Sequence, residues 1–449
     1  MTQDGGGGRH ISGSILSVGA SRAATLVAVA LTSIVVTRLL GAAGIGTYAI
    51  SFSLLFIFTV VFELGIGQGT AYFVGRDEWG GAPLARGVIR ACLTLAVPGA
   101  AAMLAGFALF GDVVPGMDWP MAVALAVALP FSLLWRVGPQ AALAQEQFEL
   151  FALFDSSTAL LACPLSIAGA LIADTTGAVI GLAAATVISG VAVAVWLLAA
   201  SSRSGGSLSP PRGLRGVFSF GSRAWVSELL QQINLRADLI LLGAYAGAAQ
   251  SGIYSIALST TSIAWILTQA FAISTLPRSA RLHAASERDD AATGRRDDAD
   301  SRLMRHTVLV IPVVAVGEIL LLLIGIPLFY GSGFHRSIDL GLILLPGSLV
   351  LGVGLAALAI LLGRGRAGLV LRVGLLVVPP TVIAYMLAAP DGGATAVAIV
   401  SSASYFVYSV LGVIALRYAT GMGYATLLAP GRSDVMDYRR AIGRLGRGS

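Results

Sequence analysis

Residues 39–51 read LLGAAGIGTYAIS, and residues 241–257 read LLGAYAGAAQSGIYSIA. In both stretches a Leu-Leu-Gly-Ala phrase is followed by a Gly-x-Tyr phrase, although the two lie in different halves of the chain. Four extra residues separate the two phrases in the second copy. We therefore expect each copy to form the turn between two helices, and the second turn to be four residues longer than the first.

Other short sequence motifs of the first half recur in the second half in the same order. Ser21-Arg22-Ala23 returns as Ser222-Arg223-Ala224, and Glu63 falls opposite Gln269 when the Gly-x-Tyr phrases are aligned. Several matching words in order, at a nearly constant spacing, predict an internal duplication of the chain.

The composition indicates a membrane protein. The chain is 56% hydrophobic and 12% charged, with a mean hydropathy of +0.84, whereas soluble domains carry roughly 25% charged residues. Backbone groups in lipid must be satisfied within each segment, so the apolar runs predict helices, and the short alternating segments of a barrel are absent from the sequence. We expect twelve spans in an all-α fold. They are placed at residues 14–40, 46–74, 86–110, 119–143, 150–173, 177–200, 215–245, 251–277, 305–329, 338–362, 367–389 and 394–418.

The stretch RSGGSLSPPRG at 203–213 indicates a cytoplasmic linker after the sixth span. Because six is even, the two halves enter the membrane in the same orientation, and we expect two pseudo-symmetric six-helix lobes around a central cavity. The predicted parts are an N-terminal lobe at 1–200, a linker at 201–214, a C-terminal lobe at 215–418 and a basic cytoplasmic tail at 419–449.

The basic residues predict the orientation. All 29 are arginines, and most fall in the termini and the even-numbered loops, which places both termini in the cytoplasm of a multi-pass protein of the cytoplasmic membrane. The pI of 9.6 therefore reflects topology and not nucleic-acid binding. Cys92 and Cys163 lie in different spans and are expected to be buried apolar residues without a disulfide or a metal.

Span 7 carries the densest set of polar residues, in the stretch SRAWVSELLQQINLRADLILLGAY. Glu228, Arg236 and Asp238 would together cost about 8 kcal/mol if they faced lipid, since each ionised residue near the bilayer centre costs roughly 2.5–3.5 kcal/mol. Helical spacing places Glu228, Gln232 and Arg236 on one face, flanked by Asp238. Asn234, the only Asn of the chain, lies in the same segment. This face is predicted to line a wet cavity or to meet partner charges.

Other ionisable residues fall inside spans. Arg22, Arg136 and Arg223 either extend to the inner surface or line a cavity, and both interpretations remain open. Glu63 lies in the glycine-rich, polar inner end of span 2, whereas Glu318 in span 9 is expected to be a packed or protonated residue. Within the spans, four arginines balance the four acids Glu63, Glu228, Asp238 and Glu318.

At these residues the chain resembles a known family. The phrase QINLRADLILLG at 232–243 is similar to the span-7 phrase of the MOP flippases, which include MurJ-type lipid II flippases and Wzx-type polysaccharide flippases. Twelve expected spans favour the polysaccharide branch, because MurJ-type relatives usually have fourteen. Further matches, in the expected order along essentially the whole chain, are residues 39–48, Glu63-Leu64-Gly65, Leu276-Pro277, PLFYGSGF at 327–334 and GRGR at 363–366.

The resemblance implies a flippase that moves an undecaprenyl-diphosphate-linked oligosaccharide across the membrane by alternating access, driven by a cation or by the membrane potential. Arginine suits bidentate diphosphate binding. The expected substrate-binding residues are Arg22, Arg136, Arg223, Gln232 and Arg236. The expected coupling residues are Glu63, Glu228, Asn234 and Asp238, with Na⁺ or H⁺ as the coupling ion and no other cofactor.

Asp238 matches an aspartate that belongs to a sodium site in lipid II flippases, where spans 11 and 12 complete the site. In this chain those spans supply no second carboxylate, so Asp238 is only a candidate sodium ligand. The polar side chains that they do offer are Thr381, Tyr385, Ser401, Ser402 and Ser404.

Three alternatives are less favoured. A MATE-like multidrug antiporter would bind cations in an acidic, aromatic cavity, but the intramembrane charges balance. A membrane glycosyltransferase or polymerase needs a large acidic external loop, and the external loops here are short, so we expect no enzymatic activity. A major-facilitator transporter normally has its longest loop after span 6, whereas here it follows span 8.

The expected partners are the lipid-linked substrate, membrane lipids, and a polysaccharide polymerase and glycosyltransferases; the chain is expected to be a monomer.

Overall fold

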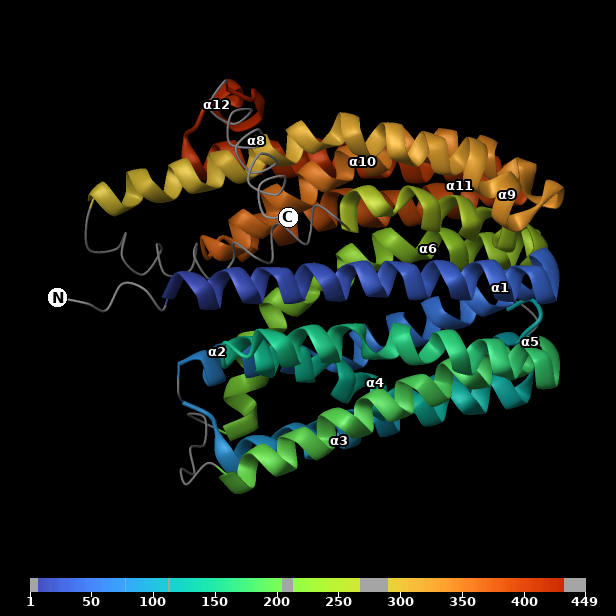
Figure 1. The fold of residues 1–449 in the computed structure, drawn as a ribbon, viewed down its shortest axis with the longest axis horizontal. Helices are drawn as coiled ribbons and strands as arrows, with labels where there is room; N and C mark the ends of the chain where they lie inside the picture. Colours follow the sequence, from blue (N-terminus) through green and yellow to red (C-terminus); the bar gives the residue numbers. More distant parts are fainter. Residues whose placement is uncertain (1–6, 77, 112–113, 204–212, 267–289, 432–449) are drawn as a thin grey trace. The chain divides into compact units, whose positions relative to one another are not determined.

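The computed structural model describes residues 7–76, 78–111, 114–203, 213–266 and 290–431, and these are almost entirely helical (Figure 1). Gln269 and Leu276-Pro277 lie outside the described residues. The helices are α1 Gly7–Glu63, α2 Ile66–Gly75, α3 Gly81–Phe110, α4 Trp119–Ala144, α5 Phe148–Arg203, α6 Gly213–Thr261, α8 Asp290–Leu320, α9 Ile326–Tyr330, α10 His335–Gly363, α11 Ala367–Thr420 and α12 Tyr424–Leu428. A π-helix at Leu321–Gly325 and a 3₁₀ turn at Ser332–Phe334 join α8, α9 and α10.

Eight of the described helices are long and apolar enough to cross a membrane. Four of them are hairpins, because each contains non-helical residues at which the chain reverses. In α6, for example, the Tyr254 hydroxyl donates a hydrogen bond to Asp238, sixteen residues earlier, whereas a straight helix would separate the two by about 24 Å. Counting each hairpin twice gives the twelve crossings that the hydropathy predicts, and the all-α membrane fold is confirmed.

The order of hairpins and single helices repeats along the chain. Hairpin, single, single, hairpin describes α1, α3, α4 and α5, and the same order describes α6, α8, α10 and α11. The reversals also correspond: Gly41 (φ 69°) in α1 matches Gly247 (φ 84°) in α6, and both need glycine because φ is positive. This pattern supports the predicted duplication.

The expected difference in turn length is wrong. Gly41 stands five residues before Gly46, and Gly247 stands five residues before Gly252, so the two turns are equally long. The four extra residues lie before the reversal, where they add about one helical turn to the first arm of α6.

The described residues belong to two compact units. Unit 1 comprises residues 1–256, 329–336 and 382–397, and unit 2 comprises residues 257–328, 337–381 and 398–449. The division into lobes at 1–200 and 215–418 stays a prediction.

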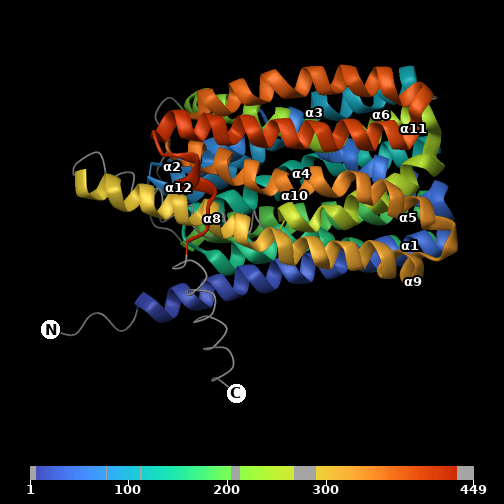
Figure 2. The same cartoon turned by 90° about the horizontal axis from the view of Figure 1, so that it is seen from above.

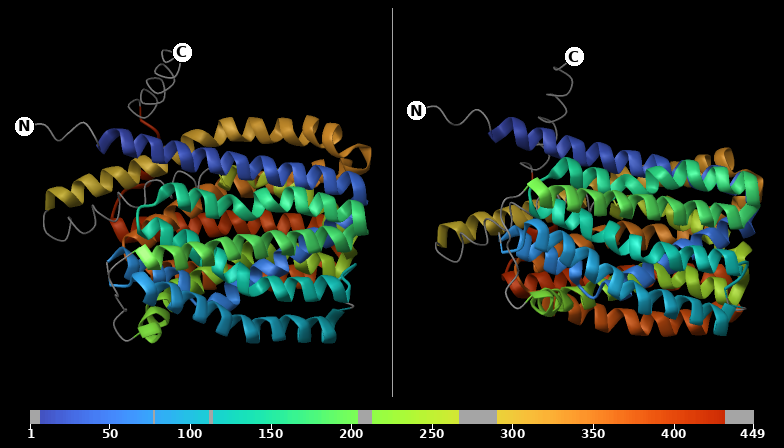
Figure 3. Two further views of the ribbon diagram at one scale, coloured as in Figure 1. Left: turned by 60° about the horizontal axis from the view of Figure 1, so that its bottom comes forward. Right: turned by 90° about the horizontal axis from the view of Figure 1, so that it is seen from below.

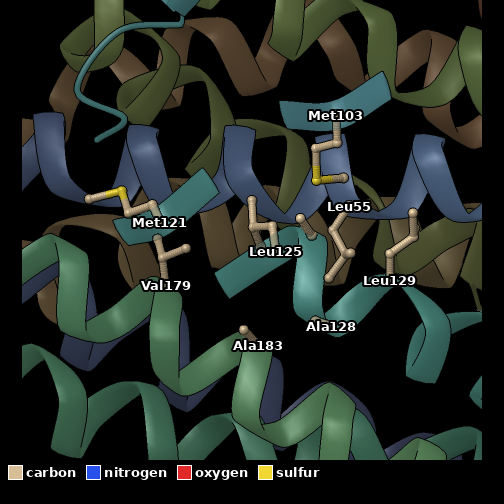
Figure 4. Packing of buried hydrophobic residues seen from close by; sticks show 9 residues of the cluster. Leu55, Met103, Met121, Leu125, Ala128, Leu129, Val179 and Ala183 are labelled. Carbon is tan, nitrogen blue, oxygen red and sulfur yellow. The ribbon is translucent and has the colours of Figure 1, made fainter. Parts of the chain in front are cut away.

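In unit 1, α4 packs against α1, α2, α3 and α5. The core at this packing is apolar, and Figure 4 shows its side chains directed toward one another from these helices: Leu55 of α1, Met103 of α3, Leu125 and Leu129 of α4, and Val179 of α5. The reversals of α1 and α5 lie at the same end of the unit, as the views in Figures 1 and 3 show.

In unit 2, α10 and the second arm of α11 approach closely through small residues. A Cβ on Gly347 would meet the backbone of Ser402, whose hydroxyl accepts a hydrogen bond from the Gly347 N–H at 3.1 Å. Arg364, which follows α10, forms ion pairs with Asp297 and Asp300 of α8 at 2.5 and 2.6 Å. Figure 2 shows the course of these helices from a second side.

Candidate functional site

A cluster of charged side chains joins three helices of unit 1. The Arg136 guanidinium of α4 donates from Nε to Glu63 Oε2 at 2.7 Å and from Nη2 to Glu228 Oε1 of α6. The second Glu228 oxygen accepts a hydrogen bond from the Gln68 amide of α2. The Arg136 and Glu63 side chains are 13% and 1% exposed, whereas Glu228 is 26% exposed, so the network is buried at Glu63 and partly exposed at Glu228. We call Glu63, Gln68, Arg136 and Glu228 the charged cluster.

The glycines of the FELGIGQG stretch allow Glu63 to reach this position. The chain leaves α1 through Leu64 (φ 46°) and Gly65 (φ 82°), both in the left-handed region, and α2 begins at Ile66. Gly65 lies directly against the backbone of Gly221 in α6, where a Cβ would collide. A Cβ on Gly67 would likewise meet the Glu63 carboxylate. These glycines therefore bring the end of α1 close to α6.

Aromatic rings of α1 extend the charged cluster to a second arginine. The Arg236 guanidinium of α6 lies over the rings of Phe56 at 4.2 Å and Phe52 at 4.9 Å. The Arg136 guanidinium lies 5.3 Å from the same Phe56 ring. Cation–π contacts of this kind contribute about 0.5–2 kcal/mol, the larger values applying where water is excluded. Phe56 thus links the two arginines that the sequence assigned to substrate binding.

Arg22 is held elsewhere in unit 1. Its guanidinium forms an ion pair with Asp155 of α5 at 3.0 Å, and the neighbouring Ser21 hydroxyl donates to the Ala152 carbonyl at 2.8 Å. Asp155 lies within the span formed by α5. The predicted balance of four arginines against four acids is therefore wrong, because Asp155 is a further intramembrane acid.

Asp238 is fully buried and hydrogen-bonded. Its Oδ2 accepts from the Tyr254 hydroxyl at 2.6 Å, and its Oδ1 accepts from the Leu239 N–H at 2.7 Å. In the part of the chain that the structure describes, no group of three or more His, Cys, Asp or Glu residues is placed to hold a metal. Of the polar side chains that spans 11 and 12 offer, Thr381 donates a hydrogen bond to Ser404 at 3.0 Å within unit 2.

The remaining predicted residues lie on the first arm of α6. Asn234 is buried, and Gln232 is half-buried. The backbone of Arg223 belongs to α6, but its side chain lies outside the described part of the structure. The structure thus brings together Glu63, Arg136, Glu228 and Arg236, and it places Arg22 in a different ion pair.

Sequence reasoning missed Phe52, Phe56, Gln68 and Asp155 as parts of these networks. Phe52 and Phe56 are spaced at i and i+4, which places both rings on one face of α1, although the same spacing is common in apolar cores. Asp155 had a clearer signal, since it is an acid that follows the apolar run LFALF within a predicted span.

Comparisons with known proteins agree with this architecture. The family model described as "Polysaccharide biosynthesis protein" matches residues 114–339. No significantly similar sequence was found among curated proteins.

Solved structures similar in fold are transporters. The outward-facing form of a multidrug resistance MATE family transporter of the MOP superfamily is 16% identical, with 91% of this chain and 95% of that chain covered and a TM-score of 0.67. The lipid II flippase MurJ in an inward closed conformation is 13% identical, with coverages of 91% and 87% and a TM-score of 0.66. A MOP superfamily transporter from Pyrococcus furiosus is 15% identical, with coverages of 92% and 96% and a TM-score of 0.62. At these identities the likeness shows the fold alone.

Proposed function

The chain belongs to the polysaccharide biosynthesis protein family, and from this premise we propose that it is a flippase for a lipid-linked oligosaccharide diphosphate. It is a multi-pass membrane transporter of the MOP superfamily, with the helical fold shared by MATE transporters and MurJ. The proposed cargo is an undecaprenyl-diphosphate-linked oligosaccharide, which moves from the inner to the outer leaflet of the cytoplasmic membrane.

The observation that carries this proposal is the buried guanidinium of Arg136, shared between two carboxylates of different helices. A diphosphate presents oxygens in the same paired geometry as a carboxylate, so it competes for the same face of an arginine. In the proposed cycle the diphosphate replaces Glu228 on Arg136. Arg236, which contacts the same Phe56 ring as Arg136, provides the second positive charge for the cargo.

The charge of the cluster supports coupling to a cation. Arg136 carries one positive charge, whereas Glu63 and Glu228 together carry two negative charges when both are ionised. A carboxylate that loses its arginine partner in a buried site is costly to keep ionised. Glu228 therefore takes up a proton when the cargo displaces it, and it releases the proton when it returns to Arg136. Asp238 remains a candidate sodium ligand, and Asn234 lies on the same arm.

The exchange of partners also gives a conformational step. In the structure Arg136 ties α4 to α1 and α6 through ion pairs. Replacing Glu228 by a diphosphate removes the tie between α4 and α6 within unit 1. The proposed alternating access follows from this release, as in other transporters whose repeats move around a central site.

The experiment is a flipping assay with a fluorescent short-chain lipid diphosphate oligosaccharide in proteoliposomes. The double variant R136A R236A is expected to lose transport, while E228Q is expected to bind the lipid but to lose the dependence of the rate on a pH gradient. R76A is the control, because Arg76 is an exposed arginine of unit 1 that is paired with Glu78 and not with a residue of the charged cluster. Wild-type flipping by a stably folded R136A R236A protein would refute the diphosphate role.

A multidrug antiporter is the second candidate, because Glu63 and Glu228 are both paired with Arg136, which itself lies over the Phe56 ring. Acidic and aromatic groups together suit organic cations. Drug susceptibility of a deletion strain separates the candidates: sensitivity to several cationic drugs with normal surface polysaccharide favours the antiporter.

The remaining assignments accompany the flippase proposal. The chain carries no enzymatic activity of its own, acts as a monomer with both termini in the cytoplasm, and works with a polysaccharide polymerase and glycosyltransferases that make and use its cargo.

A further inference from the structure

Glu318 is a buried carboxyl group that the proposed transport mechanism does not use. It lies on the membrane helix α8 in unit 2 and is 1% exposed. Its Oε1 accepts a hydrogen bond from the backbone N–H of Ala264 at 2.8 Å. Its Oε2 is buried and has no hydrogen-bond partner among the described residues.

Both helices that meet at this carboxyl group are irregular there. α6 ends at Thr261, the chain turns at Ser262, and helix resumes over residues 263–266, which include Ala264. α8 changes into a π-helix at Leu321–Gly325, three residues after Glu318. π-Helical segments occur frequently at functional sites, and irregular backbone inside a membrane persists only where other groups satisfy it. The hydrogen bond from Ala264 to Glu318 supplies such a group.

The surroundings of Glu318 favour a neutral acid. Among the described residues, no charged side chain forms an ion pair or hydrogen bond with it, and the Ala264 N–H is its one hydrogen-bond donor. An ionised carboxylate buried without a cation is strongly unfavourable, whereas a neutral carboxyl group still accepts from an N–H through its carbonyl oxygen. A metal ion would require several ligands, and no described group of three or more His, Cys, Asp or Glu residues is placed to provide them.

We propose that Glu318 is a proton-binding site, with the proton on Oε2 and with Oε1 holding the backbone of the interrupted helix at Ala264. Binding adds one proton from water to the carboxylate and leaves a neutral acid. Loss of this proton places an uncompensated charge at the junction of α6 and α8, so the bond to Ala264 and the occupancy of the proton are linked. The existence of this site is independent of the cargo, while its use in transport rests on the proposed flippase function.

Infrared difference spectroscopy of the purified full-length protein in lipid nanodiscs tests the protonation directly. Wild-type protein at neutral pH is expected to show the band of a protonated carboxyl group, and E318Q is expected to lack that component. D339N is the matched control, because Asp339 is an exposed acid on α10 of the same unit. A band that E318Q leaves unchanged, or a carboxylate band that shifts when NaCl replaces KCl, would overturn the proposal.

Hydrogen exchange tests the link to the backbone. E318A removes the acceptor, and exchange in the peptide containing Ala264 is expected to be roughly fivefold to tenfold faster, as the loss of one buried hydrogen bond predicts. E318Q retains an acceptor oxygen and imitates the neutral acid, so its exchange is expected to match that of the wild type. Equal exchange in E318A and wild type would refute the link, and E318Q shows whether the altered protein still folds.

The two proposals fail separately. If wild-type protein does not move the lipid diphosphate but keeps the infrared band that E318Q removes, the flippase assignment fails and the proton site stands. If transport is normal and the band is absent, the proton site fails alone. If both hold, wild-type protein moves the lipid diphosphate and shows the infrared band, E318Q removes the band, and D339N leaves the band unchanged.

Discussion

Gly46 and Gly252 lie at one crossing of the α1 and α6 hairpins, and each leaves room for the backbone of the other hairpin. A Cβ on Gly46 would collide with the carbonyl of Ala248, and a Cβ on Gly252 would collide with the carbonyl of Ala42. Gly252 follows Gly46 by the same number of residues by which Ala248 follows Ala42. The contact is therefore reciprocal, as a pseudo-two-fold axis requires. The repeated Gly-x-Tyr phrase is therefore a packing site at which the two copies of the repeat meet.

Replacing Gly46 by alanine tests this crossing. The new Cβ would lie 2.8 Å from the Gly252 nitrogen as well as against Ala248, and overpacking of this kind costs about 1–3 kcal/mol. G46A is expected to lower the midpoint of thermal unfolding in detergent. G106A on α3 is the control, because no atom lies within 4 Å of a Cβ there. Equal midpoints for the two variants would contradict the close approach.

Local patterns predicted the fold well. Apolar runs gave the spans, and the Gly-x-Tyr phrase gave the correct register of the two halves, because a turn and a close crossing both demand glycine at fixed positions. The Leu-Leu-Gly-Ala phrase misled the prediction of turn length, since the same letters in α6 lie one helical turn before the reversal at Gly247. The Leu-Leu-Gly-Ala residues of the two halves therefore align in sequence but do not occupy equivalent positions in the two hairpins.

The partners within the site were not predictable in the same way. Arg136 meets Glu63 and Glu228 at separations of 73 and 92 residues, on three different helices. Which side chains meet depends on how the helices pack and how each is rotated about its axis. A single sequence does not show either of these directly. Asp155 was overlooked because an acid near the start of a span resembles an ordinary helix end.

Removing the shared guanidinium is expected to be strongly destabilising. R136A leaves the buried Glu63 and the partly exposed Glu228 without their cation, and breaking the buried pair with Glu63 costs about 3–5 kcal/mol. Thermal unfolding in detergent measures the loss. R76A is the comparison, because Arg76 is 57% exposed in its pair with Glu78 and exposed ion pairs contribute little to stability. A loss from R136A no larger than that from R76A would show that the cluster is solvated.

Phe56 is expected to contribute through both arginines. F56L removes the ring that lies against Arg136 and Arg236, at a cost of about 0.5–2 kcal/mol for each contact in addition to lost packing. F58L, on the same helix but stacked on Phe62, controls for packing. A double-mutant cycle between F56L and R236Q measures the coupling, and a coupling energy of zero would exclude the cation–π contact.

The bond between Tyr254 and Asp238 is expected to hold the two arms of the α6 hairpin together. Y254F removes a donor to a buried carboxylate, which costs about 1.5–3 kcal/mol. The effect should disappear in the D238N background, as a double-mutant cycle of unfolding midpoints will show. Independent, additive effects would contradict the bond.

The unfolding midpoints of the wild type and D238N in NaCl and in KCl test Asp238 as a sodium ligand. If Asp238 binds sodium, NaCl raises the midpoint of the wild type more than KCl does, and D238N abolishes this difference.

Asp174 occupies a backbone conformation that suits glycine. Its φ of 49° and ψ of −135° nearly equal those of Gly393, at φ 53° and ψ −145°, the corresponding reversal in α11. Strained residues of this kind cost about 1–3 kcal/mol, so D174G is expected to raise the unfolding midpoint. G393A is expected to lower it, because its Cβ would lie 2.9 Å from the Gln250 Oε1. A lower midpoint for D174G would contradict the strain.

The tight reversals at Gly41, Asp174, Gly247 and Gly393 restrict how this protein can move. A chain that turns back within one or two residues has no slack, so neither arm of a hairpin can slide along its neighbour or tilt away from it at that end. The two arms of each hairpin are therefore expected to move together as one rigid body. In α1 the end of the hairpin opposite Gly41 is Glu63, where the chain leaves the helix through Gly65 against the backbone of Gly221 in α6.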